Sequence, residues 1–207
     1  MIDPGLIDMI MRLRGRGISD NAVLRAMELV ARKHFVEQTY WNAAYDEQSL
    51  PTSCGQTLSP PLTIALMTQM LELSPEHKLL EIGTGSGYHT GILSKIVKRV
   101  YSVERYKQLI REAEDRFKAQ GITNHVIRYG DGRYGWGGQK PFDRILLTCA
   151  LRAEPAMLID QLAPGGKLVA VVDDQLTRYS KARTKVTVET LFPLQLPMIE
   201  AGKSKAL

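Results

Sequence analysis

The chain of 207 residues is 44% apolar and 24% charged, which is typical of soluble globular proteins and argues against a disordered or fibrous chain. A chain of this length fits one domain, in which folding removes roughly 70% of the unfolded surface from water. The formal net charge of +5 would suit an acidic partner such as nucleic acid. The basic residues are spread along the chain, however, and this argues against a nucleic-acid-binding face.

The cysteines and the apolar segments predict the compartment. Cys54 and Cys149 stand at unrelated positions, so they cannot form a disulfide scaffold, and their spacing suits no zinc site. The longest apolar runs, such as residues 168–172, are far shorter than a membrane span. The N-terminus lacks the basic and then apolar stretch of a secretory signal. We therefore expect a cytoplasmic protein with no metal site and no membrane partner.

The first third of the chain is expected to be helical. Apolar residues recur at helical spacing over residues 6–14, 21–33 and 61–73, which predicts three helices. Residues 40–61 instead mix aromatic residues with Pro, Ser, Gly and Cys and show no period. Loops of that length in a compact domain are often functional. Residues 1–75 are therefore predicted to form a helical N-terminal extension, in which residues 40–61 form a substrate loop.

From residue 78 onward, short apolar strands alternate with helices, which predicts parallel pairing with helices on both faces of a sheet. Residues 184–191 alternate β-branched with polar residues and are expected to add an antiparallel edge. The prediction is an α/β fold with a central, mostly parallel sheet over residues 76–207, within a single domain spanning residues 1–207. Such a sheet binds its ligand at the carboxyl ends of the strands. The expected strands are residues 78–82, 99–103, 125–129, 142–148 and 167–172, and the expected helices are residues 91–97, 108–120 and 155–162.

A glycine cluster follows the first of these strands. The strand runs into Gly83, Gly85 and Gly87 in the spacing G-x-G-x-G, and glycine there lets the backbone turn tightly and approach a ligand closely. A dinucleotide site would need its third glycine at position 88, where Tyr88 stands. The spacing therefore favours a nucleoside without a pyrophosphate, although the cluster alone also fits an ordinary turn.

Two acidic residues follow at the ends of the next two strands. Glu104 stands roughly 20 residues after the first glycine, where the acceptor for ribose hydroxyls belongs; the alternative is a strand-end carboxylate facing water. Asp131, between Gly130 and Gly132, could accept a hydrogen bond from an adenine amino group. By itself the Gly-Asp-Gly segment could also be a turn.

Residues 141–148 and 162–169 add an apolar strand and a Pro-Gly-Gly turn before another strand. In this order and spacing, the five motifs resemble the series of class I S-adenosylmethionine-dependent methyltransferases. The resemblance implies a Rossmann-like fold and S-adenosyl-L-methionine as the cofactor. The residues that we expect to bind the cofactor are Glu81, Gly83, Thr84, Gly85, Gly87, Glu104, Asp131, Gly132 and Thr148.

The segment at residues 55–61, Gly-Gln-Thr-Leu-Ser-Pro-Pro, resembles the protein-L-isoaspartate O-methyltransferase family. Residues 32–36, 129–132 and 135–136 match it as well, and the likeness covers about residues 7–194. It implies methylation of the free α-carboxylate of L-isoaspartyl and D-aspartyl residues in damaged proteins. The ester then closes to a succinimide, whose hydrolysis returns some normal aspartate, so damaged proteins and peptides are the implied partners.

The implied reaction needs little acid–base chemistry. A peptide carboxylate with a pKa of about 4 is already ionised at neutral pH, so catalysis reduces to placing its oxygen about 3 Å from the methyl group in a site with little water. Ser59 is the expected catalytic residue, orienting the carboxylate by a hydrogen bond, and Thr57 is expected to assist in substrate binding. The structural alternative for Ser59 is a helix N-cap ahead of two prolines.

Other acceptors are possible in principle. One alternative is a divergent member that binds S-adenosyl-L-methionine but methylates another acceptor or acts as a non-catalytic adaptor. Another is cytosine methylation with Cys149 as the nucleophile, although a lone cysteine is more often a small apolar residue. The positions that depart from the family's usual pattern are Ser53, Cys54, Leu151, Arg152, Asp173 and Asp174.

Overall fold

The structure, a computed structural model, describes residues 3–183 and 185–204. Within them, seven strands form one sheet in the order β5-β4-β3-β6-β7-β8-β9. The strands from β5 to β7 in this order pair in parallel, whereas β8 is antiparallel to both β7 and β9. The strands are β3 Lys78–Ile82, β4 Arg99–Glu104, β5 His125–Tyr129, β6 Phe142–Leu151, β7 Leu162–Val172, β8 Gln175–Ala182 and β9 Lys185–Pro193, and a separate antiparallel pair is β1 Leu50–Pro51 with β2 Thr57–Leu58.

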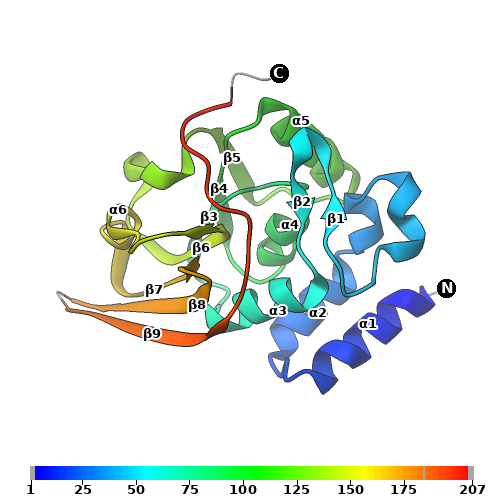
Figure 1. The fold of residues 1–207 in the computed structure, drawn as a ribbon, viewed down its shortest axis with the longest axis horizontal. Coiled ribbons are helices and arrows are strands. Elements are labelled where there is room, and N and C mark those ends of the chain that lie inside the picture. The colour runs from blue at the N-terminus through cyan, green and yellow to red at the C-terminus, as the bar shows by residue number, and fades with distance from the viewer. Residues whose placement is uncertain (1–2, 184, 205–207) are drawn as a thin grey trace.

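Helices cover both faces of the sheet (Figure 1). The α-helices are α1 Pro4–Gly15, α2 Asn21–Leu29, α3 Pro61–Met70, α4 Tyr88–Ser94, α5 Lys107–Ala119 and α6 Ala156–Ile159, and the 3-10 helices are η1 Arg32–Phe35, η2 Gln38–Ala43, η3 Ser53–Gly55, η4 Gly132–Tyr134 and η5 Gly137–Gln139. None of the helices in the described ranges is both long and apolar enough to cross a membrane.

Alternate strand residues pack into two cores, one on each face of the sheet. Leu79 and Leu146 belong to the core that includes α1 to α5, whereas Leu80 and Leu147 belong to the core that includes Leu158 of α6. Successive side chains of a strand point to opposite faces, and burial on both faces makes a parallel strand read as a continuous apolar run. Such buried runs make β3, β6 and β7 recognisable from sequence, whereas the edge strand β5 is only partly buried.

The strand order reverses at β3. From β3 the chain adds β4 and β5 on one side and then β6 and β7 on the other. Ligands of open α/β sheets bind beside the carboxyl ends of the strands at such a reversal. The end of β3 at Ile82 is therefore where this fold places a site.

The predicted helix over residues 21–33 is wrong over its last four residues, 30–33. α2 ends at Leu29, Val30 is extended (φ −104°, ψ 91°), and η1 follows. The fully buried Arg32 donates from Nε to the carbonyl of Ala44 at 2.7 Å and lies 5.1 Å from the centre of the Tyr88 ring. Burial lowers the pKa of Arg32 to about 10. These tertiary contacts override the helical propensity of the segment.

Three further predicted helices differ from their predicted bounds by three residues or more. α3 ends at Met70 rather than at residue 73. α4 starts at Tyr88 rather than residue 91, because Gly87, at φ +90°, caps it directly after the glycine cluster. α6 occupies only Ala156–Ile159 of the predicted 155–162, because Leu162 already belongs to β7.

Strand β8 was not predicted from the sequence. Asp173 and Asp174, both with positive φ (49° and 56°), form a two-residue turn between the paired residues Val172 and Gln175. A hairpin turn with two left-handed residues usually contains Asn or Gly. Because this turn has two Asp residues instead, the sequence did not predict a hairpin. Both carboxylates are exposed at the turn. The predicted edge strand over residues 184–191 is β9, and Thr184 lies outside the described residues.

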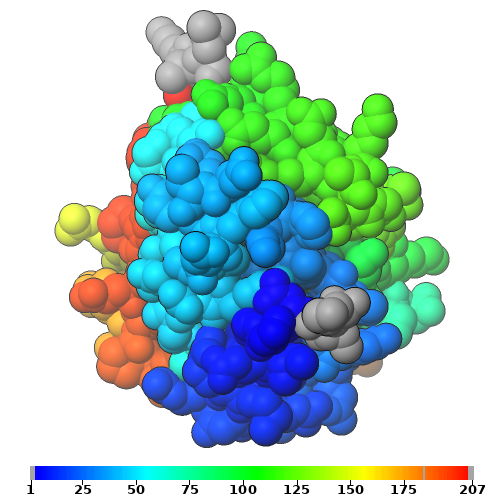
Figure 2. Space-filling view, turned by 90° about the vertical axis from the view of Figure 1, so that its right-hand side faces the viewer, coloured from blue at the N-terminus to red at the C-terminus, as the bar shows by residue number. Residues whose placement is uncertain are grey.

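The N-terminal extension shares its core with the sheet. Phe35 packs against Tyr88 of α4 and Phe117 of α5, with ring centroids 5.6 Å and 6.4 Å apart. Figure 2 shows the blue to cyan N-terminal residues lying against the green surface of the α5 region. The single-domain organisation remains a prediction, which this shared core supports.

After β9 the chain returns across the carboxyl ends of the strands, as the red segment in Figure 1 shows. The Ala150 N–H donates to the carbonyl of Pro197 at 2.8 Å, and the Ile199 N–H donates to the carbonyl of Ala150 at 2.9 Å. Further along, the Gly202 N–H donates to Asp131 Oδ2 at 2.7 Å. The sequence analysis expected nothing here, because these pairings join residues that are far apart in the chain.

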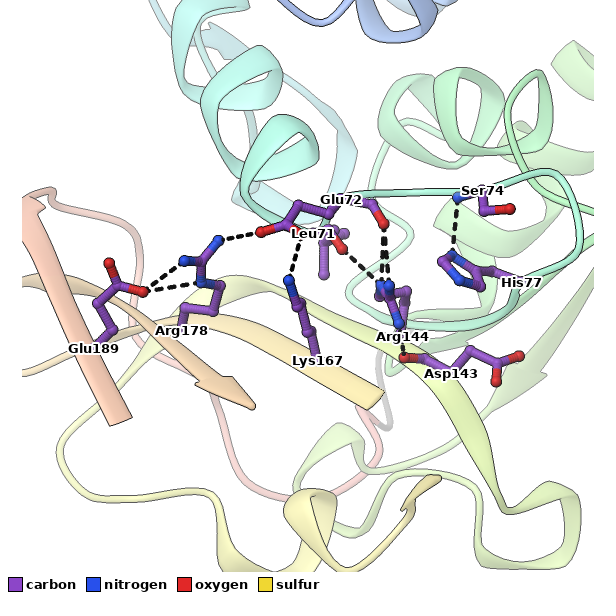
Figure 3. Close-up of polar contacts among 9 residues, drawn as sticks. All are labelled: Leu71, Glu72, Ser74, His77, Asp143, Arg144, Lys167, Arg178 and Glu189. Carbon is purple, nitrogen blue, oxygen red and sulfur yellow. Dashed lines mark hydrogen bonds and ion pairs between the residues drawn. The ribbon is translucent and has the colours of Figure 1, made fainter. Parts of the chain in front are cut away.

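A polar cluster ties the end of α3 to the sheet (Figure 3). Arg144 of β6 is buried and donates to the carbonyl oxygens of Leu71, at 2.6 Å, and Glu72, at 3.1 Å. The Glu72 carboxylate pairs with Lys167 and, at 2.7 Å, with Arg178. This cluster lies where β3 begins, so it secures the strand that leads into the site.

We expect Arg144→Ala to lower the free energy of unfolding by about 2–4 kcal/mol, because it leaves buried carbonyl groups without a donor. Chemical denaturation would measure this. Glu189→Gln is the matched control: Glu189 is an exposed partner of Arg178, and loss of a surface pair changes stability by at most about 1 kcal/mol. Equal effects of the two substitutions would contradict the role of Arg144.

Candidate active site

The glycine cluster forms a tight turn at the end of β3. Gly83 (φ +95°) and Gly87 (φ +90°) adopt backbone conformations that L side chains rarely take. A Cβ on Gly83 would lie 2.3 Å from Thr148 Oγ1, and one on Gly87 would lie 2.8 Å from the Phe117 ring. Thr148 also donates to the carbonyl oxygens of Ile82 and Gly83, at 3.0 Å and 2.9 Å. Close packing therefore requires glycine at both positions. The loop contacts the end of β6 at Gly83 and helix α5 at Gly87.

Glu104 closes β4 beside this loop. Its Oε2 accepts from the Gly85 N–H at 2.9 Å, and its Oε1 accepts from the N–H groups of Arg105, at 2.7 Å, and Tyr106, at 3.0 Å. Burial raises the pKa of Glu104, while the three backbone donors oppose that shift. The carboxylate is thus fixed in orientation by backbone and lines the cavity at the strand ends.

A cavity at the carboxyl ends of the strands lies between the glycine loop (residues 83–87), the substrate loop (residues 40–61) and the C-terminal segment (residues 197–200). The residues that line it are Gln56, Thr57, Ser59, Ile82, Gly83, Gly85, Val103, Glu104, Arg105, Tyr106, Leu109, Gly132, Thr148, Cys149, Pro197, Met198, Ile199 and Glu200. A smaller cavity adjoins it, with Thr57, Ser59, Gly83, Gly85 and Thr148 lining both. The two loops therefore face one another across a shared space.

Several predicted site residues meet in this space. The larger of these two cavities is lined by the predicted cofactor-binding residues Gly83, Gly85, Glu104, Gly132 and Thr148 and by the predicted substrate-binding residues Thr57 and Ser59. Thr84 lines the smaller cavity, and its hydroxyl bonds to Ser102 Oγ at 2.6 Å. Gly87 does not line either cavity but fixes the packing of the loop.

The structure does not bring Glu81 into the cavity. Its side chain is fully buried beneath the glycine loop and accepts from Thr90 Oγ1 and, at 2.7 Å, from Ser102 Oγ. Burial raises the pKa of Glu81 to about 8, while the hydrogen bonds from Thr90 and Ser102 oppose that shift. Its position supports the loop from below.

Asp131 also stands back from the cavity lining. Its carboxylate accepts from Arg133, at 2.7 Å, and from the Gly202 N–H, and Arg133 lowers the pKa of Asp131 to about 2. Only its neighbour Gly132 lines the cavity. A Cβ on Gly132 would lie 2.3 Å from Ile82 Cγ2, so the turn there also requires glycine.

Ser59 does not cap a helix. The residue that precedes the first turn of α3 is Pro60, and in that turn the Leu62 N–H donates to the Glu47 carboxylate at 3.1 Å. Within the described residues, the Ser59 hydroxyl has no hydrogen-bond partner, although Ser59 lines both cavities. The donor is therefore available to a ligand opposite the glycine loop.

Cys149 lines the cavity, but its environment does not favour a nucleophile. Burial raises the pKa of the Cys149 thiol to about 12, whereas reactive cysteines have lowered pKa values. His89 lies at the other end of the site, and burial lowers its pKa to about 3. The site therefore holds a neutral thiol and a neutral imidazole.

The C-terminal lining, from Pro197 to Glu200, and the pair Arg105 and Tyr106 were missed by the sequence analysis. Glu200 forms an ion pair with Arg105 and accepts from the Tyr106 hydroxyl at 3.3 Å. Arg105 and Tyr106 directly follow Glu104, so their adjacency was the available signal. The C-terminal segment carried no comparable local pattern.

Two solved structures resemble this one over most of the chain. One, a protein-L-isoaspartate O-methyltransferase, superposes with a TM-score of 0.84 at 22% identity and covers 95% of this chain, which in turn spans 66% of that protein. The other, from Plasmodium falciparum, is described as a β-aspartate methyltransferase in complex with S-adenosyl-L-homocysteine, and has a TM-score of 0.81 at 23% identity, covering 93% and 97% of the two chains. These likenesses confirm the predicted Rossmann-like fold class.

The sequence itself is closer to bacterial proteins. A protein named protein-L-isoaspartate O-methyltransferase from Maricaulis maris is 46% identical over 99% of this chain and 98% of its own length, and one from Caulobacter sp. strain K31 is 42% identical over 98% and 95%. The family model for protein-L-isoaspartate(D-aspartate) O-methyltransferase (PCMT) matches residues 7–195. The chain therefore belongs to the protein-L-isoaspartate O-methyltransferase family, as the segment at residues 55–61 predicted.

Proposed function

We propose that this chain transfers a methyl group from S-adenosyl-L-methionine to the free α-carboxylate of L-isoaspartyl and D-aspartyl residues in damaged proteins, which starts their repair through a succinimide. The observation that carries the proposal is the unpaired Ser59 hydroxyl facing the glycine loop across a shared cavity. Family membership supports it independently.

The donor side of the cavity fits a nucleoside joined to an amino acid. Gly83, Gly85 and Gly132 leave backbone exposed at the cavity wall without a Cβ, and the oriented Glu104 carboxylate can accept from both hydroxyls of a ribose. Thr148 and Thr84 complete this side. When bound, the cofactor supplies an electrophilic methyl group on a sulfonium. Glu81 and Asp131 do not line the cavity. Their hydrogen bonds, to Ser102 and to the Gly202 N–H, hold the turns that follow β3 and β5.

The acceptor side has to orient an anion. At neutral pH the isoaspartyl carboxylate is ionised and is itself the nucleophile, so no general base is needed. The Ser59 hydroxyl donates to one carboxylate oxygen, which leaves the other free to meet the methyl group, and Thr57 adds a second donor in the same loop. Holding the carboxylate oxygen in line with the methyl group then supplies most of the acceleration.

Labelled methyl transfer to a pair of peptides tests the proposal. One peptide contains an isoaspartyl residue and its twin contains aspartate at the same place. We expect label in the isoaspartyl peptide alone. Tight cofactor binding with no transfer to either peptide would instead support a non-catalytic adaptor, and equal transfer to both would show that the site does not select the isoaspartyl geometry.

Cys149→Ala is expected to leave turnover of the isoaspartyl peptide within about twofold of the unsubstituted protein, because a buried neutral thiol takes no part in carboxylate methylation. Steady-state kinetics would show this. A loss of all activity would contradict the proposed mechanism and favour a cysteine nucleophile.

Damaged proteins and peptides are the partners under this proposal, and the proposed compartment is the cytoplasm. Cys54 and Cys149 are both free thiols, which suits a reducing compartment. Methylation of cytosine at carbon is not proposed, since it needs a reactive thiol and burial raises the pKa of the Cys149 thiol.

A further inference from the structure

The turn of the substrate loop is fastened to helix α5. The Ser53 hydroxyl donates to Glu112 Oε1 at 2.7 Å, and Gln108 Nε2 donates to the same oxygen at 2.9 Å. The Cys54 thiol contacts Gln108 Oε1 at 3.8 Å. Figure 2 shows the cyan segment that contains this turn against the green α5 region.

The turn needs such contacts, because its backbone is strained. Cys54 adopts φ +61° and ψ 24°, a left-handed conformation that is unfavourable for a residue with a side chain. Strained conformations persist only where the surroundings hold them. The bonds to α5 provide that restraint, and Thr57 and Ser59 follow a few residues later in the same loop.

The same helix face also reaches the glycine loop. Glu112 Oε2 lies 3.5 Å from Arg116 NH2, and Arg116 NH1 donates to the carbonyl oxygen of Ser86 at 3.0 Å. Residues four apart lie on one face of a helix, so Glu112 and Arg116 form a row. Ser86 lines the smaller cavity. Three side chains therefore join the substrate loop to the glycine loop, in the order Ser53, Glu112, Arg116.

The helix that carries this row is firmly held. Leu109, Ala113 and Phe117 are buried on the adjacent face of α5, and Phe117 packs against Gly87. The side chains of Glu112 and Arg116 are 28% and 21% exposed, so water screens their pairing less than that of a surface pair.

We propose that Glu112 and Arg116 are positioning residues that couple the substrate loop to the glycine loop, so that the methyl donor and the isoaspartyl peptide bind cooperatively. When the glycine loop is ordered by the cofactor, the Ser86 carbonyl fixes Arg116, which fixes Glu112 and, through Ser53, the loop that carries Ser59. The coupling rests on the proposed function, because it concerns the same two ligands.

Calorimetry on the full chain tests the coupling. The dissociation constant of an isoaspartyl peptide is measured without ligand and with saturating S-adenosyl-L-homocysteine. The ratio of the first dissociation constant to the second measures the coupling. We expect this ratio to be about five or more in the unsubstituted protein and close to one in Glu112→Ala. Reciprocally, the peptide should tighten S-adenosyl-L-homocysteine binding by the same factor.

Other variants separate coupling from folding. Glu112→Gln keeps an acceptor for Ser53 but loses the charge that attracts Arg116, so its ratio should be intermediate. Ser53→Ala breaks the row at its loop end without changing the helix, and its ratio should also fall. Asp115→Asn, an exposed carboxylate on the same helix, is the matched control and should keep the full ratio.

The outcomes separate the coupling from the proposed function. A ratio of one in the unsubstituted protein, or an unchanged ratio in Glu112→Ala and Ser53→Ala, overturns the coupling while peptide methylation still stands. Absence of isoaspartyl peptide binding and methylation in the unsubstituted protein overturns the proposed function and the coupling together.

Discussion

Glu104→Ala is expected to weaken binding of S-adenosyl-L-methionine about 10- to 150-fold. The substitution removes an ionised acceptor for two ribose hydroxyls, and a hydrogen bond to a charged group contributes about 1.5–3 kcal/mol. It also frees the N–H groups of Gly85, Arg105 and Tyr106, which the carboxylate now accepts. Calorimetric titration with the cofactor measures the effect directly.

Two controls accompany the Glu104 measurement. Glu104→Gln keeps the size of the side chain and one acceptor oxygen. Its affinity for the cofactor should therefore lie between those of the unsubstituted protein and Glu104→Ala. Thermal unfolding without ligand establishes that the variant folds. An affinity that stays unchanged in folded Glu104→Ala would show that the carboxylate does not hold the sugar.

Ser59→Ala is expected to lower kcat/KM for an isoaspartyl peptide about 10- to 100-fold, because it removes a donor to the charged carboxylate. Cofactor affinity and thermal stability should not change, since within the described residues the hydroxyl has no other partner. Ser59→Thr retains a hydroxyl and should recover part of the activity. Steady-state kinetics with varied peptide would provide the values.

Ser49→Ala is the matched control for Ser59. Ser49 is exposed and lies in the same loop but lines neither cavity, so loss of its hydroxyl should leave kcat/KM within about twofold of the unsubstituted value. If both serine substitutions had equal effects, the assigned role of Ser59 would be wrong. A fall in cofactor affinity in Ser59→Ala would instead place its hydroxyl on the donor side.

The sheet and the glycine loop were predictable because their signals are local. β3 reads as an apolar run that ends in glycines, and the conformations of Gly83 and Gly87 require the residue type that the sequence shows. Glu104 follows from a fixed distance along the chain and from its place at a strand end. Such features depend on near neighbours in sequence, so pattern and spacing suffice.

Other features depend on contacts between distant residues. Strand β8 was hidden because Asp173 and Asp174 form a turn that more often contains Asn or Gly. The return of the C-terminal segment over Ala150 leaves no local pattern. Similarly, Glu81 stands in a ligand-binding motif, but the alternation along β3 directs its side chain to Thr90 and Ser102.

The bond between Ser53 and Glu112 illustrates the same limit at the site. The two residues are 59 positions apart, and each alone reads as ordinary polar surface. Only the folded chain shows that they connect the two loops. The sequence could therefore identify the binding partners of the site, but not the contacts that align them.

The most direct test of this account locates the transferred methyl group. A peptide with one isoaspartyl residue is incubated with the protein and S-adenosyl-L-methionine, and fragmentation mass spectrometry then maps the product. The account predicts one methyl ester, on the isoaspartyl α-carboxylate, which disappears as the succinimide forms. A methyl group on any other atom, or an unmodified peptide in the presence of bound cofactor, would contradict it.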